Sequence, residues 1–130
     1  MYIDIGNGMG RRLEKIHIWL DDERPAPAGW YPLRSYETAK GVLWKCLNTS
    51  TREYYLAAIS FDHDLGGEHT GYDLCLDIQR MVHDYLLGPF DWYVHSMNPV
   101  GRANIMFAMT QVERLWRARG YQIPPCEVPL

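Results

Sequence analysis

The chain has 130 residues, of which 47% are hydrophobic and 22% charged, as expected of one globular domain. Its formal net charge of −3 gives no overall basic field, so we expect no binding to duplex DNA. No apolar run approaches the roughly 20 residues of a membrane span, and no apolar signal segment opens the chain. We therefore expect one cytoplasmic, non-membrane domain over residues 1–130. Its core would cover about residues 15–120, between a leader (1–12) and an irregular tail (121–130).

The three cysteines do not indicate a disulfide framework or a zinc site. Cys46, Cys75 and Cys126 are an odd number and form no C-x-x-C pair. Cys46 and Cys75 fall on the apolar faces of predicted helices. This pattern is typical of reduced, buried thiols in a cytosolic protein.

The first third of the chain predicts two short strands joined by a rigid loop. Residues 15–20 are mostly apolar and β-branched, and residues 2–5 could add an edge strand or belong to a loose leader. Two prolines in residues 25–29 exclude a helix there, and Pro32 places a strand over 30–33 at a sheet edge. Because this loop is too short for a usual helical crossover, either the crossover is collapsed or the second strand is not parallel.

The remainder alternates helices and strands. Ser35 is a good N-cap for a helix that runs to about residue 47, and residues 55–61 form a near-continuous apolar strand. A second helix carries apolar residues from 74 to 85, a third strand covers 91–95, and a last helix ends at Gly120. The alternation predicts an α/β domain with a mostly parallel sheet and helices on both faces.

Polar chemistry follows three of the predicted strands. Asp21-Asp22 ends the first, Asp62-His63-Asp64 follows the buried strand, and His95-Ser96 ends the third. Carboxyl ends of parallel strands open onto one crevice, where ligands bind. Carboxylates this close need a cation or a proton among them, and oxygen ligands suit Mg²⁺ or Mn²⁺. We expect the metal ligands to be Asp21, Asp22 and Asp62, although the acidic pair could also be a solvated turn in which Asp22 caps the next segment of the chain.

Other residues at these strand ends could act on a phosphate. Asp62 could be a nucleophile, and His63 and His95 could each serve as general acid or base. Arg24 could clamp phosphate oxygens with its fork of donors. The helix N-terminus after the third strand is itself an anion site. Its neighbours Ser96, Asn98 and Arg102 would steady the phosphate, although Ser96 or Asn98 could equally be a helix cap.

Taken together, three segments resemble one known family. They are Leu20-Asp21-Asp22-x-Arg24-x-Pro, then Ser60 to Gly66 with Thr70 to Asp73, then His95-Ser96-x-Asn98-Pro99-x-Gly101-x-x-Asn104. The pattern is similar to the cyclic-phosphate-processing receiver-like family, derived from receiver domains of two-component signalling, over about residues 16–110. The resemblance makes Asp62 the counterpart of the phosphoacceptor, and it adds Asp64 and Asn104 to the substrate-binding positions.

This resemblance implies a receiver-like (flavodoxin-like) three-layer sandwich that lacks the fifth strand, with its lysine, and the fifth helix. Its first helix would be reduced to residues 25–29. The implied activity is a metal-dependent phosphoesterase for cyclic phosphates of nucleotides or RNA ends, in RNA repair or virus–host conflict, and the gene could be carried by a phage. Alternatives are a non-catalytic receiver-like module that binds a partner, and a protein that sequesters a cyclic nucleotide. The sequence does not indicate an oligomeric state.

Overall fold

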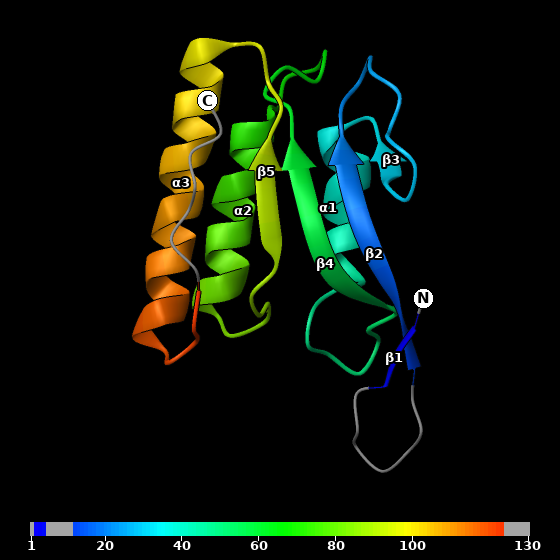
Figure 1. Cartoon of the computed structure of the whole chain (residues 1–130), viewed down its shortest axis with the longest axis vertical. Helices are drawn as coiled ribbons and strands as arrows, with labels where there is room; N and C mark the ends of the chain where they lie inside the picture. The colour runs from blue at the N-terminus through cyan, green and yellow to red at the C-terminus, as the bar shows by residue number, and fades with distance from the viewer. Residues whose placement is uncertain (1, 5–11, 124–130) are drawn as a thin grey trace.

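Strands and helices alternate along residues 2–4 and 12–123, the part of the chain that the computed structural model describes (Figure 1). Residues 5–11 of the expected leader and 124–130 of the expected tail lie outside it, as does Cys126. The elements, in order, are β1 (Tyr2–Asp4), β2 (Arg12–Leu20), β3 (Tyr31–Leu33), α1 (Tyr36–Trp44), β4 (Tyr54–Phe61), α2 (Gly71–His83), β5 (Asp91–Val94) and α3 (Pro99–Ala118).

The sheet is parallel in its functional part. Strands β3, β2, β4 and β5 pair in parallel in that order, and β1 pairs antiparallel with the beginning of β2. β3 lies beside the last residues of β2, so the crossover between these two strands is the collapsed loop and the second strand is parallel. The described residues contain no helix between Leu20 and Tyr31 and no further strand after β5.

An irregularity in β4 adjusts the register between the two central strands. Ile16 pairs with Leu56, but His17 pairs with Ala58, so Ala57 is an extra residue in β4. A bulge of this kind locally disrupts the ladder and changes which face the following residues occupy. Beyond it the pairing continues regularly to Leu20 and Phe61.

All three helices pack on one face of the sheet (Figure 1). Apolar residues of α1, α2 and α3 join Ile18, Leu20, Ile59 and Phe61 in a single core cluster. This confirms the expected fold class, a receiver-like α/β domain truncated at its C-terminal end. Of the two helical layers expected of the sandwich, the described residues form one, because the reduced first crossover and the missing fifth helix would have supplied the other.

Aromatic side chains take the place of that second layer on the other face, which we call the open face. Trp30, from the β2–β3 loop, has edge contacts with Trp19 of β2 at 6.1 Å and with Tyr93 of β5 at 6.0 Å between ring centroids. Since β4 runs between β2 and β5, the indole of Trp30 lies across β4. Ala58 and Ser60, the small residues of β4 on this face, are both only 3% exposed.

The helix ends are set by side-chain caps. Ser35 caps α1 as expected, and Thr70 caps α2 in a reciprocal capping box with Asp73. Asn98, rather than Ser96, caps α3. The first helix ends at Trp44, somewhat earlier than its apolar spacing predicts. Cys46 and Cys75 are free and buried, as expected. No helix in the described part of the chain is long and apolar enough to cross a membrane.

Candidate active site

Three side chains meet in one row at the carboxyl ends of the parallel strands. The sheet ladder continues past the strand ends: Asp62 N–H donates to Leu20 O and His95 N–H donates to Phe61 O, both at 3.0 Å. Asp21, Asp62 and His95 therefore follow β2, β4 and β5 at the same level, and we call them the site row. One ligand atom from each lies within 4.8 Å of those of the other two.

Asp21 is the most buried member of the site row, with 1% of its surface exposed. Its Oδ1 accepts the backbone N–H groups of Glu23 and Arg24 at 2.8 Å, and its Oδ2 lies 3.0 Å from Nε2 of His95. Burial raises the pKa of Asp21, but the N–H groups of Arg24 and Glu23 and the His95 ring outweigh it, so the pKa is below its usual value. Asp21 is therefore a charged acceptor for His95.

Asp62 has the opposite electrostatic character. Its Oδ1 accepts the backbone N–H of His63 at 2.8 Å. Burial, and then the negative charge of Asp21, raise the pKa of Asp62 above its usual value, while the N–H of His63, the His95 ring and the Ser96 hydroxyl act against the rise. Two neighbouring carboxylates of which one resists ionisation form a site that favours a positive charge between them.

The imidazole of His95 is held on three sides. Nε2 faces Asp21, Nδ1 lies 2.8 Å from Oγ of Ser60, and the ring stacks on Trp19 with 3.8 Å between centroids and 7° between planes. Burial lowers the pKa of His95, and Asp21 acts in the opposite direction. Because Asp21 is ionised, Nε2 carries the proton in a neutral His95, and Nδ1 accepts from the Ser60 hydroxyl.

Ser60 and Trp19 contact His95 but were not among the predicted site residues, although Ser60 begins one of the family-like segments. Each lies two residues before an acidic strand end, at the alternate position that shares a face with Asp62 or Asp21. The period of two in a strand was the signal that could have found them. Only the packing of Trp30 and β5 against that face shows that they contact His95.

The donor set of the site row fits a hard divalent cation. Asp21 and Asp62 converge beside the His95 imidazole, and burial together with the charge of Asp21 raises the pKa of Asp62, so a cation between the two carboxylates would favour its ionised form. Among the described residues the group that could hold an ion contains His95 and not Asp22. Asp22 is turned toward the loop after β4, where its Oδ2 would lie 3.0 Å from a Cβ placed on Gly66.

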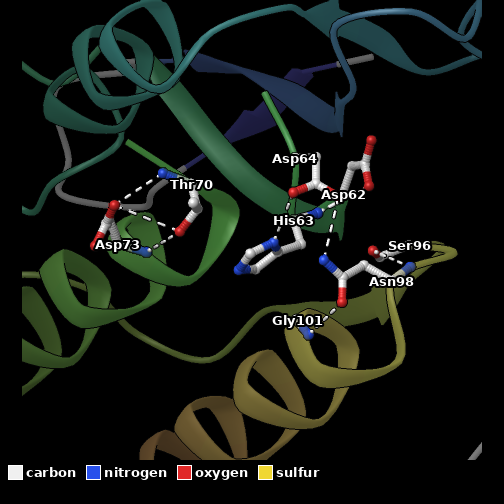
Figure 2. Close-up of polar contacts among 8 residues, drawn as sticks. All are labelled: Asp62, His63, Asp64, Thr70, Asp73, Ser96, Asn98 and Gly101. Atoms are coloured by element: carbon white, nitrogen blue, oxygen red, sulfur yellow. Dashed lines mark hydrogen bonds and ion pairs between the residues drawn. The ribbon is translucent and has the colours of Figure 1, made fainter. Parts of the chain in front are cut away.

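The predicted residues His63, Asp64 and Asn98 form a separate cluster between the end of β4 and the start of α3 (Figure 2). Nδ1 of His63 lies 3.1 Å from Oδ1 of Asp64, and Nδ2 of Asn98 donates to Oδ2 of Asp64 at 3.3 Å. Oδ1 of Asn98 accepts the N–H of Gly101 at 3.0 Å, and Oγ of Ser96 accepts the N–H of Asn98 at 3.2 Å. This cluster fastens α3 to the loop after β4.

His63 is packed against the helix rather than into the site row. A Cβ on Gly101 would lie 2.2 Å from Cγ of His63, so the ring occupies the space beside this glycine. In Figure 2 the His63 ring and the Asp62 carboxylate point away from each other. The structure thus brings His95, and not His63, together with the two carboxylates.

Of the remaining predicted residues, two arginines contact the backbone at the end of β5. Arg24 donates from Nη1 to the carbonyl of His95 at 3.2 Å, and Arg102 donates from Nη1 to the carbonyl of Val94 at 2.7 Å. Arg24 is exposed beside the site row, whereas Arg102 is half-buried. Asn104 lies exposed on α3, beyond the cluster around Asn98.

Fold and site together define a receiver-type domain whose strand ends carry two carboxylates and a histidine. The model of the cyclic-phosphate processing receiver domain matches residues 16–111, and the chain belongs to this family. No curated protein and no solved structure matches the chain significantly.

Proposed function

We propose that the protein is a metal-dependent phosphoesterase that opens cyclic phosphates of nucleotides or RNA ends. The observation that carries this proposal is the site row, in which Asp21, Asp62 and His95 present ligand atoms within 4.8 Å of one another. Membership of the cyclic-phosphate processing receiver family supports the substrate class. The open carboxyl edge of the sheet, where ligands of such folds bind, supports the location.

In this proposal Asp21 and Asp62 hold Mg²⁺ or Mn²⁺. A bound ion of this kind polarises a phosphoryl group and lowers the pKa of a coordinated water. Asp21 is already ionised and fixed by two backbone N–H groups, so it offers a preformed ligand. The pKa of Asp62 is raised in the free protein, and a bound cation would favour its ionised form. Asp22, also expected to be a ligand from the sequence, would have to turn away from the loop at Gly66 to join them.

The proton-transfer group in this proposal is His95. Its ring is fixed by Ser60 and Trp19, and Nε2 faces the carboxylates where the reacting phosphate would lie. A positioned acid or base of this type contributes about 10²- to 10⁴-fold to a rate. His63 has a supporting role, since its ring packs on Gly101 and joins the cluster that holds α3.

Phosphate oxygens would be bound by the groups around the end of β5. Arg24 is anchored at the His95 carbonyl through Nη1, and its remaining guanidinium donors would bind phosphate oxygens. Ser96, Asn98, Asp64, Arg102 and Asn104 would line or support the substrate side of the site. A 2′,3′-cyclic phosphate is strained, so a small set of groups is sufficient to open it.

Turnover of adenosine 2′,3′-cyclic phosphate tests the proposal. With Mg²⁺ or Mn²⁺ the protein should yield a nucleoside 2′- or 3′-monophosphate, detected by ³¹P NMR, and Asp62→Asn should reduce the rate at least 100-fold. The matched control is Asp84→Asn, which changes an exposed carboxylate at the C-cap of α2. Folded protein that binds the nucleotide without turning it over would instead support the sequestering alternative. A stable adduct on Asp62 after treatment with a small phosphodonor would support the non-catalytic receiver module.

A further inference from the structure

We propose that the open face of the sheet next to the site row binds the nucleobase of the substrate. This inference rests on the proposed function and deepens it, because it assigns the part of the protein that binds the base of the nucleotide or RNA end. It starts from the aromatic rings that gather on this face and from the stacking of one of them, Trp19, on His95.

The aromatic face is continuous with the site row because of the strand register. Trp19 pairs with Ser60, and Ser60 pairs with Tyr93, so these three residues form the next row on the same face. Two residues along a strand correspond to roughly 6.5–7 Å. A phosphate at the site row and a base at the Tyr93 level would therefore be separated by about the length of one ribose.

The aromatic rings differ in how much of their surface a ligand can reach. Trp19 is covered on one face by His95 and meets the edge of Trp30, so it is occupied by its neighbours. Tyr93 is 50% exposed, although it also contacts the edge of Trp30. Tyr93 is thus the ring on which a flat ligand can stack, with Trp30 beside it.

A hollow adjoins Tyr93. Its volume is about 650 Å³, within the range of small-molecule sites, and the described residues that line it include Lys15, His17 and Tyr55 of the open face. Gln122 and Ile123, which follow α3, line it from the other side. The hollow therefore combines aromatic surface with polar groups that can bind base edges.

The chemistry of this face favours a nucleobase over an apolar partner segment. Its rings carry polar atoms (the Tyr93 hydroxyl and the His17 nitrogens), and a purely apolar segment would leave these atoms without acceptors or donors. Nucleobases are flat and polar at their edges, and every base has a face that stacks on an aromatic ring.

Binding of two ligands to Tyr93 variants tests this inference without turnover. The probes are adenosine 3′-monophosphate and inorganic phosphate, titrated into metal-free ¹⁵N-labelled protein while the tryptophan indole signals are followed by NMR. Tyr93→Ala should raise the Kd for adenosine 3′-monophosphate by about 5- to 150-fold, the range expected for loss of one base-stacking contact. The Kd for inorganic phosphate should stay within about twofold.

Three further variants define the result. Tyr93→Phe should retain the affinity, and Tyr93→Leu, which keeps apolar bulk without an aromatic face, should lose as much as alanine. Phe107→Ala removes a similarly exposed ring on the helical side and should change neither Kd.

An unchanged Kd for adenosine 3′-monophosphate in Tyr93→Ala would overturn the inference and would mean that the rings only cover the sheet. An equal loss for both probes would also overturn it. Absence of turnover refutes the proposed function separately, because these Kd values do not depend on hydrolysis.

Discussion

Asp21 and Asp62 are neighbours in the site row, yet their pKa values move in opposite directions. Asp21 receives two backbone N–H groups from the turn that follows it, and these stabilise its charge despite burial. Asp62 accepts a single backbone N–H group, that of His63, and lies beside the negative charge of Asp21. The free protein therefore holds a carboxylate that opposes folding at neutral pH, which is common where a binding site and not stability has shaped the sequence.

Replacing Asp62 by asparagine should stabilise the metal-free protein. A carboxyl group with a raised pKa in the folded state destabilises the fold at pH values above that pKa. This destabilisation decreases as the pH falls through the folded-state pKa of Asp62, and it is absent below the unfolded-state pKa. A gain of about 1 kcal/mol at pH 7 would appear as a rise in Tm of roughly 3–6 °C. Thermal unfolding at pH 7 and at pH 3 measures it; an equal gain at both pH values would contradict this explanation.

Divalent metal should stabilise the wild-type protein through the same residue. Mg²⁺ or Mn²⁺ at about 100 times its Kd adds about 2.7 kcal/mol to folding stability if it binds only the folded state. Asp62→Asn should abolish most of the resulting Tm shift, whereas Asp22→Asn should retain at least half of it, because Asp22 lies outside the group of converging ligands. A larger loss in Asp22→Asn than in Asp62→Asn would show that Asp22 is a ligand and that the site row is not the metal site.

At the scale of elements, the site depends on how closely α2 approaches the end of β4. The N–H of Gly71, the first residue of α2, donates to the carbonyl of His63 at 2.9 Å. A Cβ on Gly71 would lie 1.9 Å from the backbone oxygen of Asp62. The start of this helix thus rests directly on the backbone that carries Asp62, and only glycine permits the contact.

Gly71→Ala should therefore damage both stability and the site. The displaced backbone is expected to cost about 2–3 kcal/mol, in the range of overpacked buried positions. The matched control is Gly41→Ala in α1, where nothing lies within 4 Å of the added Cβ and better helix propensity should add about 0.5–1 kcal/mol. Urea denaturation compares the two. Wild-type stability in Gly71→Ala would mean that the α2 contact is not tight.

The elements themselves were largely predictable, because periodicity and caps act locally. Ser35 and the apolar strand before Asp62 identified α1 and β4, and Pro32 correctly placed β3 at an edge. It was harder to predict from the sequence which side chains meet at the strand ends. The turn after β2 decides that Asp21 faces inward while Asp22 faces the Gly66 loop, and no sequence periodicity records that turn. Likewise, His63 was as plausible as His95 until the packing of α3 placed its ring against Gly101.

At the scale of the molecule, one helical layer and one aromatic layer enclose the sheet. The helical side holds the core cluster, including Cys46 and Cys75, both fully buried. The aromatic side is thinner and consists of a few rings, with Trp30 at their centre. The prediction of helices on both faces failed to anticipate this asymmetry in the described residues, because loss of a helix from a crossover does not reveal what replaces it.

The two core thiols should report on opening of the helical side. Burial raises the pKa of Cys46 to about 12, and burial also raises the pKa of Cys75. At pH 8 both should therefore be modified by iodoacetamide only through unfolding, at similar rates, as measured by mass spectrometry of their peptides. The urea-unfolded protein provides the control for full reactivity. Modification of Cys46 at the rate of that unfolded control, under native conditions, would contradict its burial.

The extra residue at Ala57 makes the two halves of β4 out of phase with each other. Before it, Leu56 faces the helices, and after it Ile59 and Phe61 do so at odd positions, so the alternation is shifted by one. A deletion at position 57 would restore one uninterrupted alternation, in which Leu56, Ile59 and Phe61 all keep their places on the helical face and the pairing with β2 is unchanged. Position 57 is therefore a place within the sheet where the strand can lose a residue while Asp62 still follows Phe61 in the site row.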